Sequence, residues 1–363
     1  MPGKLDIDDI ILNFDPAAPQ QRFRTVGLEA AFAPVAAALP GAIPWPENAT
    51  PKAAPLAVAP AETDDLSRFH GYDAVVVTWT AAEASALAAL FTPEHPTATW
   101  YEYRHNIASY IPLVTGGRAP FNSRQADMAR YYHSLGMYFP CTIGSARVLL
   151  FKSGLHLDYD GPATPVHRLM SEIAQTVEPK VFITTGTGGG IGGDVSLGDV
   201  VIAGTVRFDC RRQFHAQPWA TASYRSSALP HRALAAITPA LTSVNAARIP
   251  GARATPQIFS TASDAIVTTD FFAFDDSTNH YQLQGLGRAC DMGDAMVATA
   301  LQSVPGIAWY AIRNASDPQM PNATDNIRQA EQEAGKIYSR YGGLTTAASV
   351  IATWAIIHTA HRH

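Results

Sequence analysis

Residues 181–209 read VFITTGTGGGIGGDVSLGDVVIAGTVRFD: an apolar segment, a glycine-rich segment and a second apolar segment. Continuous apolar runs of this kind are typical of strands that are covered on both faces of a sheet. Positions 188–193 also fit the glycine pattern of a dinucleotide-binding loop, but such a loop leads into a helix that faces the pyrophosphate. A polar turn and a strand follow here instead. We therefore interpret the glycines as a turn between strands, at which the backbone approaches a ligand closely.

Strand and helix patterns alternate on both sides of this segment. The apolar runs predict strands at 73–79, 146–154, 199–209 and 307–313. The helical spacing predicts helices at 81–91, 165–178, 294–302, 325–341 and 344–358. Pro165 directly after Thr164 is a favoured start for the second of these helices. The alternation predicts an α/β layered fold with a covered sheet, in one domain spanning 71–363.

The first seventy residues have a different composition. Alanine and proline dominate from 30 to 61, and proline excludes a regular helix or an inner strand. We interpret 1–70 as an extension laid over the domain, because Leu28, Phe32, Ile43 and Trp45 offer apolar anchors.

Charge and composition exclude several classes of protein. The chain has 363 residues and a net charge of −5, which argues against a nucleic-acid partner. No uninterrupted apolar stretch reaches the ~18 residues of a membrane span, and the acidic start is unlike a secretory signal. Three cysteines without CxxC spacing indicate neither a disulfide framework nor a zinc site. We expect a cytoplasmic protein without a membrane partner.

Five blocks, in the right order, resemble the nucleoside phosphorylase and nucleosidase superfamily, which includes the purine nucleoside phosphorylases and the methylthioadenosine/S-adenosylhomocysteine nucleosidases. They are VVVTWTAAEASAL (75–87), LLFKSG (149–154), the glycine-rich segment with its following strand, CDMGDAMVA (290–298) and AIRNASDPQ (311–319). The resemblance spans roughly 73–358. It implies a three-layer α/β/α sandwich with a mixed central sheet and a homo-oligomer, expected to be a dimer.

The resemblance also implies roles for three residues in cleaving an N-glycosidic bond. Asp317 takes the place of the acid that protonates N7 of a leaving purine, and Ser316 orients it. Such an acid needs a raised pKa to hold its proton near neutral pH. Glu83 aligns with the carboxylate that activates water. These residues predict a nucleosidase that acts on a purine nucleoside, a small-molecule partner.

The substrate-binding residues follow from the same blocks, with one departure. Met292 is expected under the sugar, and Asp291 replaces the first Glu of the family's Glu-Met-Glu block. Gly293 stands where the second Glu would hold the ribose hydroxyls, and Asp294 is a substitute only if the helix start shifts. The other expected contacts are Gly188, Gly189, Arg207, Phe208 and Ile266, with the aromatic run 270–274 close to the base pocket.

Water is the expected nucleophile, because the arginines that bind phosphate in the phosphorylases are missing at the matched positions. Arg147 and Arg168 fall elsewhere, so a phosphorylase would need relocated arginines. A nucleoside-binding or sensing protein that has lost catalysis is a further alternative, motivated by Gly293. The motif HLDYD (156–160) lacks a distant fourth ligand, so neither a metal nor another cofactor is expected.

Overall fold

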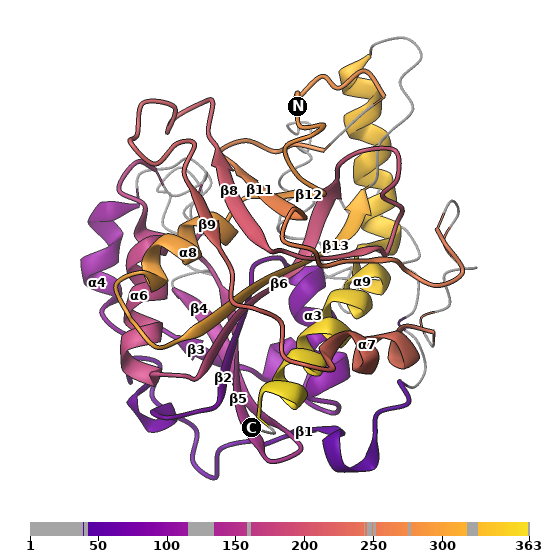
Figure 1. The fold of residues 1–363 in the computed structure, drawn as a ribbon. Helices are drawn as coiled ribbons and strands as arrows, with labels where there is room; N and C mark the ends of the chain where they lie inside the picture. Colours follow the sequence, from indigo (N-terminus) through magenta and orange to yellow (C-terminus); the bar gives the residue numbers. More distant parts are fainter. Residues whose placement is uncertain are drawn as a thin grey trace, which may run out of the picture.

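A computed structural model describes residues 43–114, 134–157, 161–242, 252–274, 277–317 and 326–361, together with Leu39, Val244 and Ile249. Within these residues one mixed sheet runs through the whole molecule (Figure 1). Its main path is β1 (Pro51–Ala53), β4 (Gly136–Ile143), β5 (Ala146–Ser153), β2 (Ala74–Thr78), β6 (Val181–Gly190), β12 (Ala289–Asp291), β11 (Ala265–Thr269), β8 (Thr205–Asp209) and β9 (Ser223–Arg225).

Four further strands join this path at its sides. β13 (Ala308–Asp317) pairs in parallel with β6 and antiparallel with β7 (Val200–Ile202). β10 (Ile258–Phe259) pairs with β7, and β3 (Tyr101–Tyr103) pairs with β4. The partners of β6 on its two edges, β2 and β13, lie parallel to it, whereas β12 pairs antiparallel with its last residues. The glycine-rich end of β6 is therefore the point at which the sheet changes direction.

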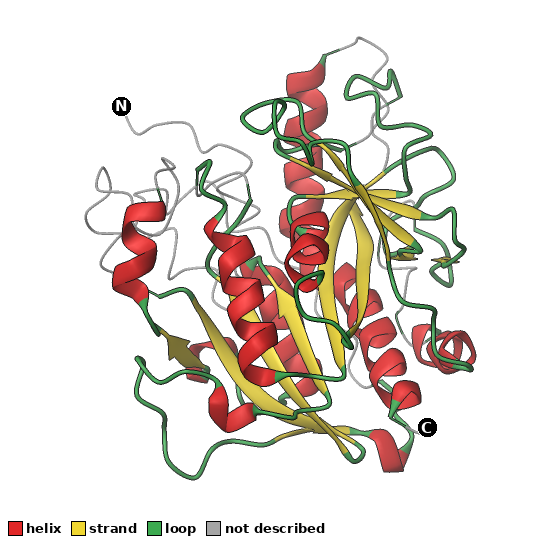
Figure 2. Cartoon of the chain, turned by 60° about the vertical axis from the view of Figure 1, so that its left-hand side comes forward, coloured by secondary structure: helices red, strands yellow, loops and turns green. Residues whose placement is uncertain are grey.

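Helices cover both faces of the sheet (Figure 2). On one face, α3 (Ala81–Phe91), α7 (Ala233–Leu241) and α9 (Ile327–Ala360) share an apolar core with β2, β5 and β13. On the other, α6 (Pro165–Val177) and α8 (Asp294–Leu301) form a second core with the opposite side of the strands. The short helix α4 (Ile107–Tyr110) lies beside α6. The predicted three-layer sandwich with a mixed sheet is confirmed.

Several predicted boundaries are wrong, and the strand predicted at 307–313 continues to Asp317 in β13. The run 199–209 is divided into β7 and β8, and Gly204 lies at the break, where a Cβ would collide with the carbonyl of Thr261 and with Ala262. The two predicted closing helices are one helix of 34 residues, α9. Glycine costs about 1 kcal/mol in a helix, yet Gly342 lies inside α9, where a Cβ would be only 3.2 Å from the Tyr338 ring. Burial of the helix outweighs its weak propensity at this point.

The glycine-rich segment also differs from the prediction. β6 continues as a strand to Gly190, so the turn begins only after the glycines at 186–190. Of the expected N-terminal extension, Pro51–Ala53 forms an edge strand, Ile43 is buried, and Trp45 contacts Trp354 at 4.9 Å between ring centroids. Leu28 and Phe32 lie outside the described residues.

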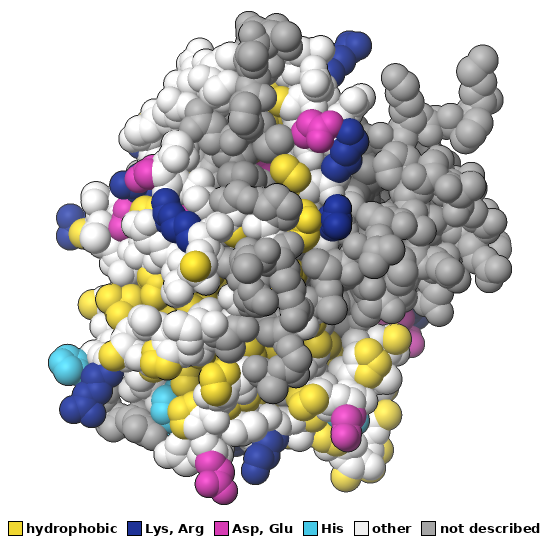
Figure 3. Space-filling view, turned by 90° about the vertical axis from the view of Figure 1, so that its right-hand side faces the viewer, with side chains coloured by type: hydrophobic (Ala, Val, Ile, Leu, Met, Phe, Trp, Pro, Cys, Tyr) yellow, Lys and Arg dark blue, Asp and Glu magenta, His cyan; other side chains and the backbone are white. Residues whose placement is uncertain are grey.

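The described helices and surface charges can be compared with those of membrane-spanning and nucleic-acid-binding proteins. Among the described helices, α9 alone is long and apolar enough to cross a membrane, and 83% of its most apolar window is buried inside the protein, as in a core helix. On the face in Figure 3, the described Lys and Arg side chains are scattered rather than gathered in one patch. The absence of a nucleic-acid partner stays a prediction.

Candidate active site

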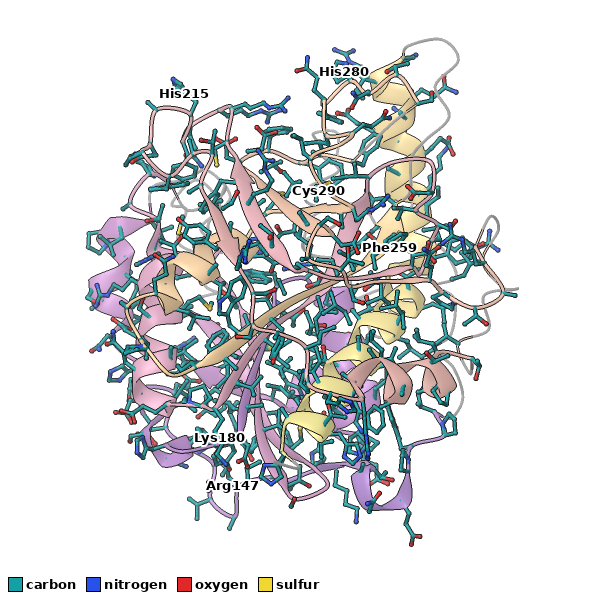
Figure 4. The ribbon with its side chains drawn as sticks, in the orientation of Figure 1. Arg147, Lys180, His215, Phe259, His280 and Cys290 are labelled. Atoms are coloured by element: carbon teal, nitrogen blue, oxygen red, sulfur yellow. The ribbon has the colours of Figure 1, made fainter. Side chains whose placement is uncertain are left out.

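A cavity lies where the ends of β6, β12 and β13 meet the first turn of α3 and the side of α9. Cys290 of β12, labelled in Figure 4, is one of its lining residues. The described wall has three acidic side chains, Glu83, Asp291 and Asp317, and one basic side chain, Arg313. Glycines, hydroxyl-bearing side chains, His156 and apolar and aromatic side chains complete it, and such a mixture is usual for a small-molecule site.

Glu83 is held at the start of α3 by an unusually large set of donors. Its Oε2 accepts from the Thr78 hydroxyl (2.6 Å) and from the amides of Trp79 (3.0 Å) and Thr80 (2.9 Å). Its Oε1 accepts from the amide and hydroxyl of Thr187, both at 2.7 Å. The residue is also the reciprocal partner of Thr80 in a capping box. These five donors explain why a fully buried carboxylate stays ionised.

The pKa of Glu83 reflects opposing effects. Burial raises it, but the Arg313 guanidinium, 3.7 Å from Oε1, and the hydrogen bonds lower it by more. Close approach of β6 makes this arrangement possible: Gly186 has a φ of +155°, and a Cβ there would collide with the Glu83 carboxylate. The glycine at 186 is therefore required by the carboxylate behind it rather than by a phosphate.

Arg313 is the centre of a buried cluster of charges. Its guanidinium contacts Asp294 through Nε (2.8 Å) and Nη2 (2.5 Å), and Nη2 also lies 3.2 Å from Asp291 Oδ2. With Glu83 there are three carboxylates around one cation. Burial and the neighbouring Asp294 raise the pKa of Asp291, against the opposing effect of Arg313. The cluster gives this side of the cavity a net negative charge.

Asp317 is the last residue of β13 and has a different environment. It is 4% exposed, and its Oδ1 accepts from the Ser316 hydroxyl at 2.6 Å. Its Oδ2 is buried without a hydrogen-bond partner among the described residues. Burial raises the pKa of Asp317 to about 7, although the Ser316 hydrogen bond lowers it. A carboxyl group in this state can hold a proton at neutral pH and direct it into the cavity.

Seven of the site residues predicted from the sequence line the cavity. They are Glu83, Gly188, Gly189, Asp291, Met292, Ser316 and Asp317. The structure thus brings together residues from β6, β12, β13 and α3. Their catalytic and binding roles stay predictions.

The other four predicted residues do not line it. Phe208 and Ile266 are fully buried in the core, because their strand positions point toward α8. Arg207 lies next to Phe208 on β8, outside the cavity wall. Asp294 is fully buried behind the wall and bound to Arg313, so it does not take the place of a side chain at 293. From the aromatic run 270–274, Phe272 reaches the wall.

Several wall residues were missed by the sequence reasoning. Arg313 had a signal, since it is a charged residue in the middle of an apolar strand. Thr187 also had a signal, since it carries a hydroxyl group within the glycine run. Trp79 and Tyr338 carried no signal, because a tryptophan after a strand and a tyrosine on a helix are ordinary core residues. His156 also lines the cavity, and burial lowers its pKa to about 3, so its ring is neutral.

Comparison with solved structures found matches of low sequence identity. It is similar to the 5′-methylthioadenosine/S-adenosylhomocysteine nucleosidase of Neisseria meningitidis, with 17% identity over 78% of this chain and 97% of that chain and a TM-score of 0.46. The corresponding enzyme of Helicobacter pylori has 11% identity over 79% and 99%, with a TM-score of 0.49. Futalosine hydrolase of Helicobacter pylori has 11% identity over 79% and 97%, with a TM-score of 0.46.

Comparison with curated proteins gave no match. A model of the phosphorylase superfamily matches residues 113–341, which is more than half of the chain. The matched range includes β6, β12, β13 and the start of α9, the elements that supply most of the cavity wall. The chain therefore belongs to the phosphorylase superfamily.

Proposed function

We propose that the protein is a nucleosidase that hydrolyses the N-glycosidic bond of a purine nucleoside. The observation that carries the proposal is the buried carboxyl of Asp317, whose Oδ2 has no partner among the described residues and whose pKa is raised to about 7. In this role Asp317 protonates N7 of the base, so that the base leaves as a neutral molecule. Ser316 holds the other carboxyl oxygen and thereby fixes the direction of transfer.

The charged cluster supports the electrostatic side of this reaction. Cleavage of an N-glycosidic bond develops positive charge on the sugar, as in glycoside hydrolysis. The carboxylates of Glu83 and Asp291 lie on the cavity wall with a net negative charge around Arg313. Fixed negative charge beside a developing cation lowers the barrier without any reorganisation during the reaction.

Water is favoured over phosphate by the same cluster. Of the described residues that line the cavity, Arg313 is the sole lysine or arginine, and its guanidinium is already shared among Glu83, Asp291 and Asp294. A phosphate dianion there would lie beside carboxylates with no free cation to hold it. Phosphorolysis therefore lacks its binding group in the described part of the wall.

The arginines considered from the sequence do not change this balance. Arg147 and Lys180 lie at the opposite end of the molecule from Cys290 (Figure 4). Arg147 donates to the carbonyl of Gly71, and Arg168 pairs with Glu172 at 2.7 Å. A phosphorylase that uses either arginine is not favoured by these positions.

Product analysis tests the proposal. Purine nucleosides are incubated with the protein with and without phosphate, and the free base and sugar are separated by chromatography. We expect free base and free sugar at the same rate in both conditions. A sugar 1-phosphate formed only with phosphate would establish the phosphorylase alternative instead.

Glu83 is proposed to activate the attacking water. Because all its donors come from the protein, it can bind water only if a hydroxyl of Thr78 or Thr187 turns away from it. The change Glu83→Gln is expected to abolish base release while nucleoside binding, measured by calorimetry, is retained. The matched control is Thr78→Val, which removes one donor and keeps the carboxylate. Loss of binding in Glu83→Gln would show that the residue is structural.

One observation favours a second candidate, a nucleoside-binding protein without turnover. A carboxylate with a lowered pKa and a full set of donors is a weak base. Calorimetric binding of a nucleoside with no base released on long incubation would establish that candidate. The expected cytoplasmic location and homodimer stay predictions.

A further inference from the structure

A buried tyrosine on α9, Tyr338, places its hydroxyl between two threonines of the cavity wall. Tyr338 is 2% exposed and lines the cavity, where α9 packs against α3 (Figure 1). Its hydroxyl lies 2.9 Å from the Thr80 hydroxyl and is also hydrogen-bonded to the Thr187 hydroxyl. Thr187 in turn donates to Glu83 Oε1 at 2.7 Å. The hydroxyls of Thr80, Tyr338 and Thr187, here called the hydroxyl chain, therefore end on the carboxylate of Glu83.

The Tyr338 ring is held in place by the helix that carries it. A Cβ on Gly342, one turn further along α9, would lie 3.2 Å from two atoms of this ring and 3.3 Å from a third. Nine in ten real Cβ contacts are longer than this, so the ring lies where a side chain at 342 would be. Because the ring packs on bare helix backbone and its hydroxyl is bonded at the other end, the hydroxyl stays between the two threonines.

The number of protons fixes the direction of the hydroxyl chain. A carboxylate can only accept, so the single hydroxyl proton of Thr187 points at Glu83. Burial and the charge of Glu83 raise the pKa of Tyr338, so the phenol is neutral and has one proton. The phenol donates this proton to Thr187, and its oxygen accepts from Thr80. All three hydroxyls therefore point toward Glu83.

In this direction the hydroxyl chain closes Glu83 to water. One carboxylate oxygen offers about two acceptor sites, and Oε1 already accepts from the amide and the hydroxyl of Thr187. Oε2 has three donors, one of them the hydroxyl of Thr78. Thr187 belongs to the cavity wall, whereas Thr78 is fully buried. Of these donors, the Thr187 hydroxyl is therefore the one that a water in the cavity can replace.

Resting on the proposed function, we propose that Tyr338 is a positioning residue that opens Glu83 to the attacking water. When the hydroxyl chain reverses, Thr187 donates to the phenol and the phenol donates to Thr80. The Thr80 hydroxyl then turns toward the cavity that it lines. Hydroxyl protons rotate without movement of heavy atoms. The reversal thus frees one acceptor site on Glu83 Oε1 and gives the Thr187 proton a new acceptor.

The freed site receives the proton of the reaction. Water bound there gives one proton to Glu83 Oε1, while its oxygen forms the new bond to the anomeric carbon. The bond between this carbon and the base breaks, and the base leaves with the proton of Asp317. Glu83 ends as the neutral acid and Asp317 as the carboxylate. Loss of one proton to solvent and uptake of another restore both groups.

Tyr338→Phe tests the middle of the hydroxyl chain, because it keeps the ring and removes the hydroxyl. Thr187 then loses its second acceptor on the protein, and its proton stays on Glu83. Water must replace a hydrogen bond to a charged group without compensation, so we expect kcat to fall about 10- to 100-fold with KM unchanged. Steady-state release of free base measures both constants. A wild-type kcat in this variant overturns the proposal.

Thr187→Val in the Tyr338→Phe background separates this role from a structural one. Valine has no proton that must turn away, so kcat should rise at least about tenfold above that of Tyr338→Phe. The matched control, Tyr338→Phe/Thr78→Val, also removes one donor from Glu83 but leaves the Thr187 proton in place, and no recovery is expected.

The two double variants lose the same number of hydroxyls, so their comparison does not depend on a general effect on folding. Recovery with Thr187→Val alone supports the proposal. The absence of recovery with Thr187→Val, or an equal recovery with Thr78→Val, overturns it.

Failure of the proposed function would look different. If the wild-type protein releases no base from any purine nucleoside, the hydrolase proposal is overturned, and the role of Tyr338 with it. If the wild-type protein releases base and Tyr338→Phe releases it with the same kcat, the hydrolase proposal stands and the role of Tyr338 alone is overturned.

Discussion

Asp317→Asn is expected to lower kcat/KM for a purine nucleoside by about 10²- to 10⁴-fold, or roughly 3–5 kcal/mol of barrier. The amide keeps the size of the side chain and still accepts from Ser316, but it has no acidic proton for the base. Steady-state release of free base provides the measurement. Full activity in this variant would show that another group protonates the base.

The pH profile supplies an independent test of the same group. Because the pKa of Asp317 is raised to about 7, the wild-type rate should fall as the pH rises through 7. The matched control is Ser316→Ala, which keeps the acid and removes the hydrogen bond that lowers its pKa. In that variant the alkaline limb should move to higher pH. If the alkaline limb of the pH–rate profile does not move in Ser316→Ala, a group other than Asp317 determines it.

The same pKa predicts an effect on stability with a definite sign. The folded state holds the Asp317 proton more tightly than the unfolded state, whose pKa is 3.8. Stability from this group is therefore complete below about pH 4 and is lost as the pH rises through 7. Asp317→Asn removes this loss, so the variant should be at least as stable as wild type at pH 8 in urea denaturation. The burial that lets Asp317 keep its proton near neutral pH therefore lowers the free energy of unfolding at higher pH.

Arg313→Met is expected to have the largest effect on folding. It leaves the buried carboxylates of Glu83, Asp291 and Asp294 without their cation, and breaking a buried ion pair costs about 3–5 kcal/mol. Urea denaturation at pH 8 measures the free energy of unfolding. The deficit should shrink at pH 5, because carboxylates without a cation take up protons more readily in the folded state.

Arg313→Lys is the control for this change. Lysine keeps the charge but cannot reproduce the two-pronged contact with Asp294. We expect a stability between wild type and Arg313→Met. If Arg313→Met were as stable as wild type at pH 8, the cluster would not be held by the guanidinium.

The sequence predicted most of the elements but not how they end. Strand β2 and helix α3 were placed within a residue or two, because an apolar run and an alanine-rich run have clear periods. β6 was predicted too short, since a glycine run has no strand propensity and gains its pairing from β13 and β12. The pair Gly342–Gly343 predicted a break in α9 that burial overrides.

The site was predicted where a polar residue stood at the end of an apolar strand. Asp317 fits that description, whereas Glu83 lies in the first turn of the helix that follows such a strand; both were assigned through the family resemblance, and both line the cavity. Phe208 was a poor choice, because an aromatic residue in a strand is more often core than ligand contact. Trp79 was not predicted as a wall residue. Its ring lies against Gly293, which is 214 positions away in the chain. Only the folded chain shows that these two positions share one space.

Helix α9 contributes both to the cavity wall and to the apolar core. Tyr338, whose hydroxyl lies 2.9 Å from that of Thr80, belongs to the cavity wall, and Trp354 is buried in the core. At ~1.5 Å per residue they are about 24 Å apart along one unbroken rod. A mutation that loosens the far end of this helix can tilt the near end, and the tilt would move Tyr338 in the cavity wall. Substitutions in the interior of the protein and the shape of the cavity are therefore coupled through one helix.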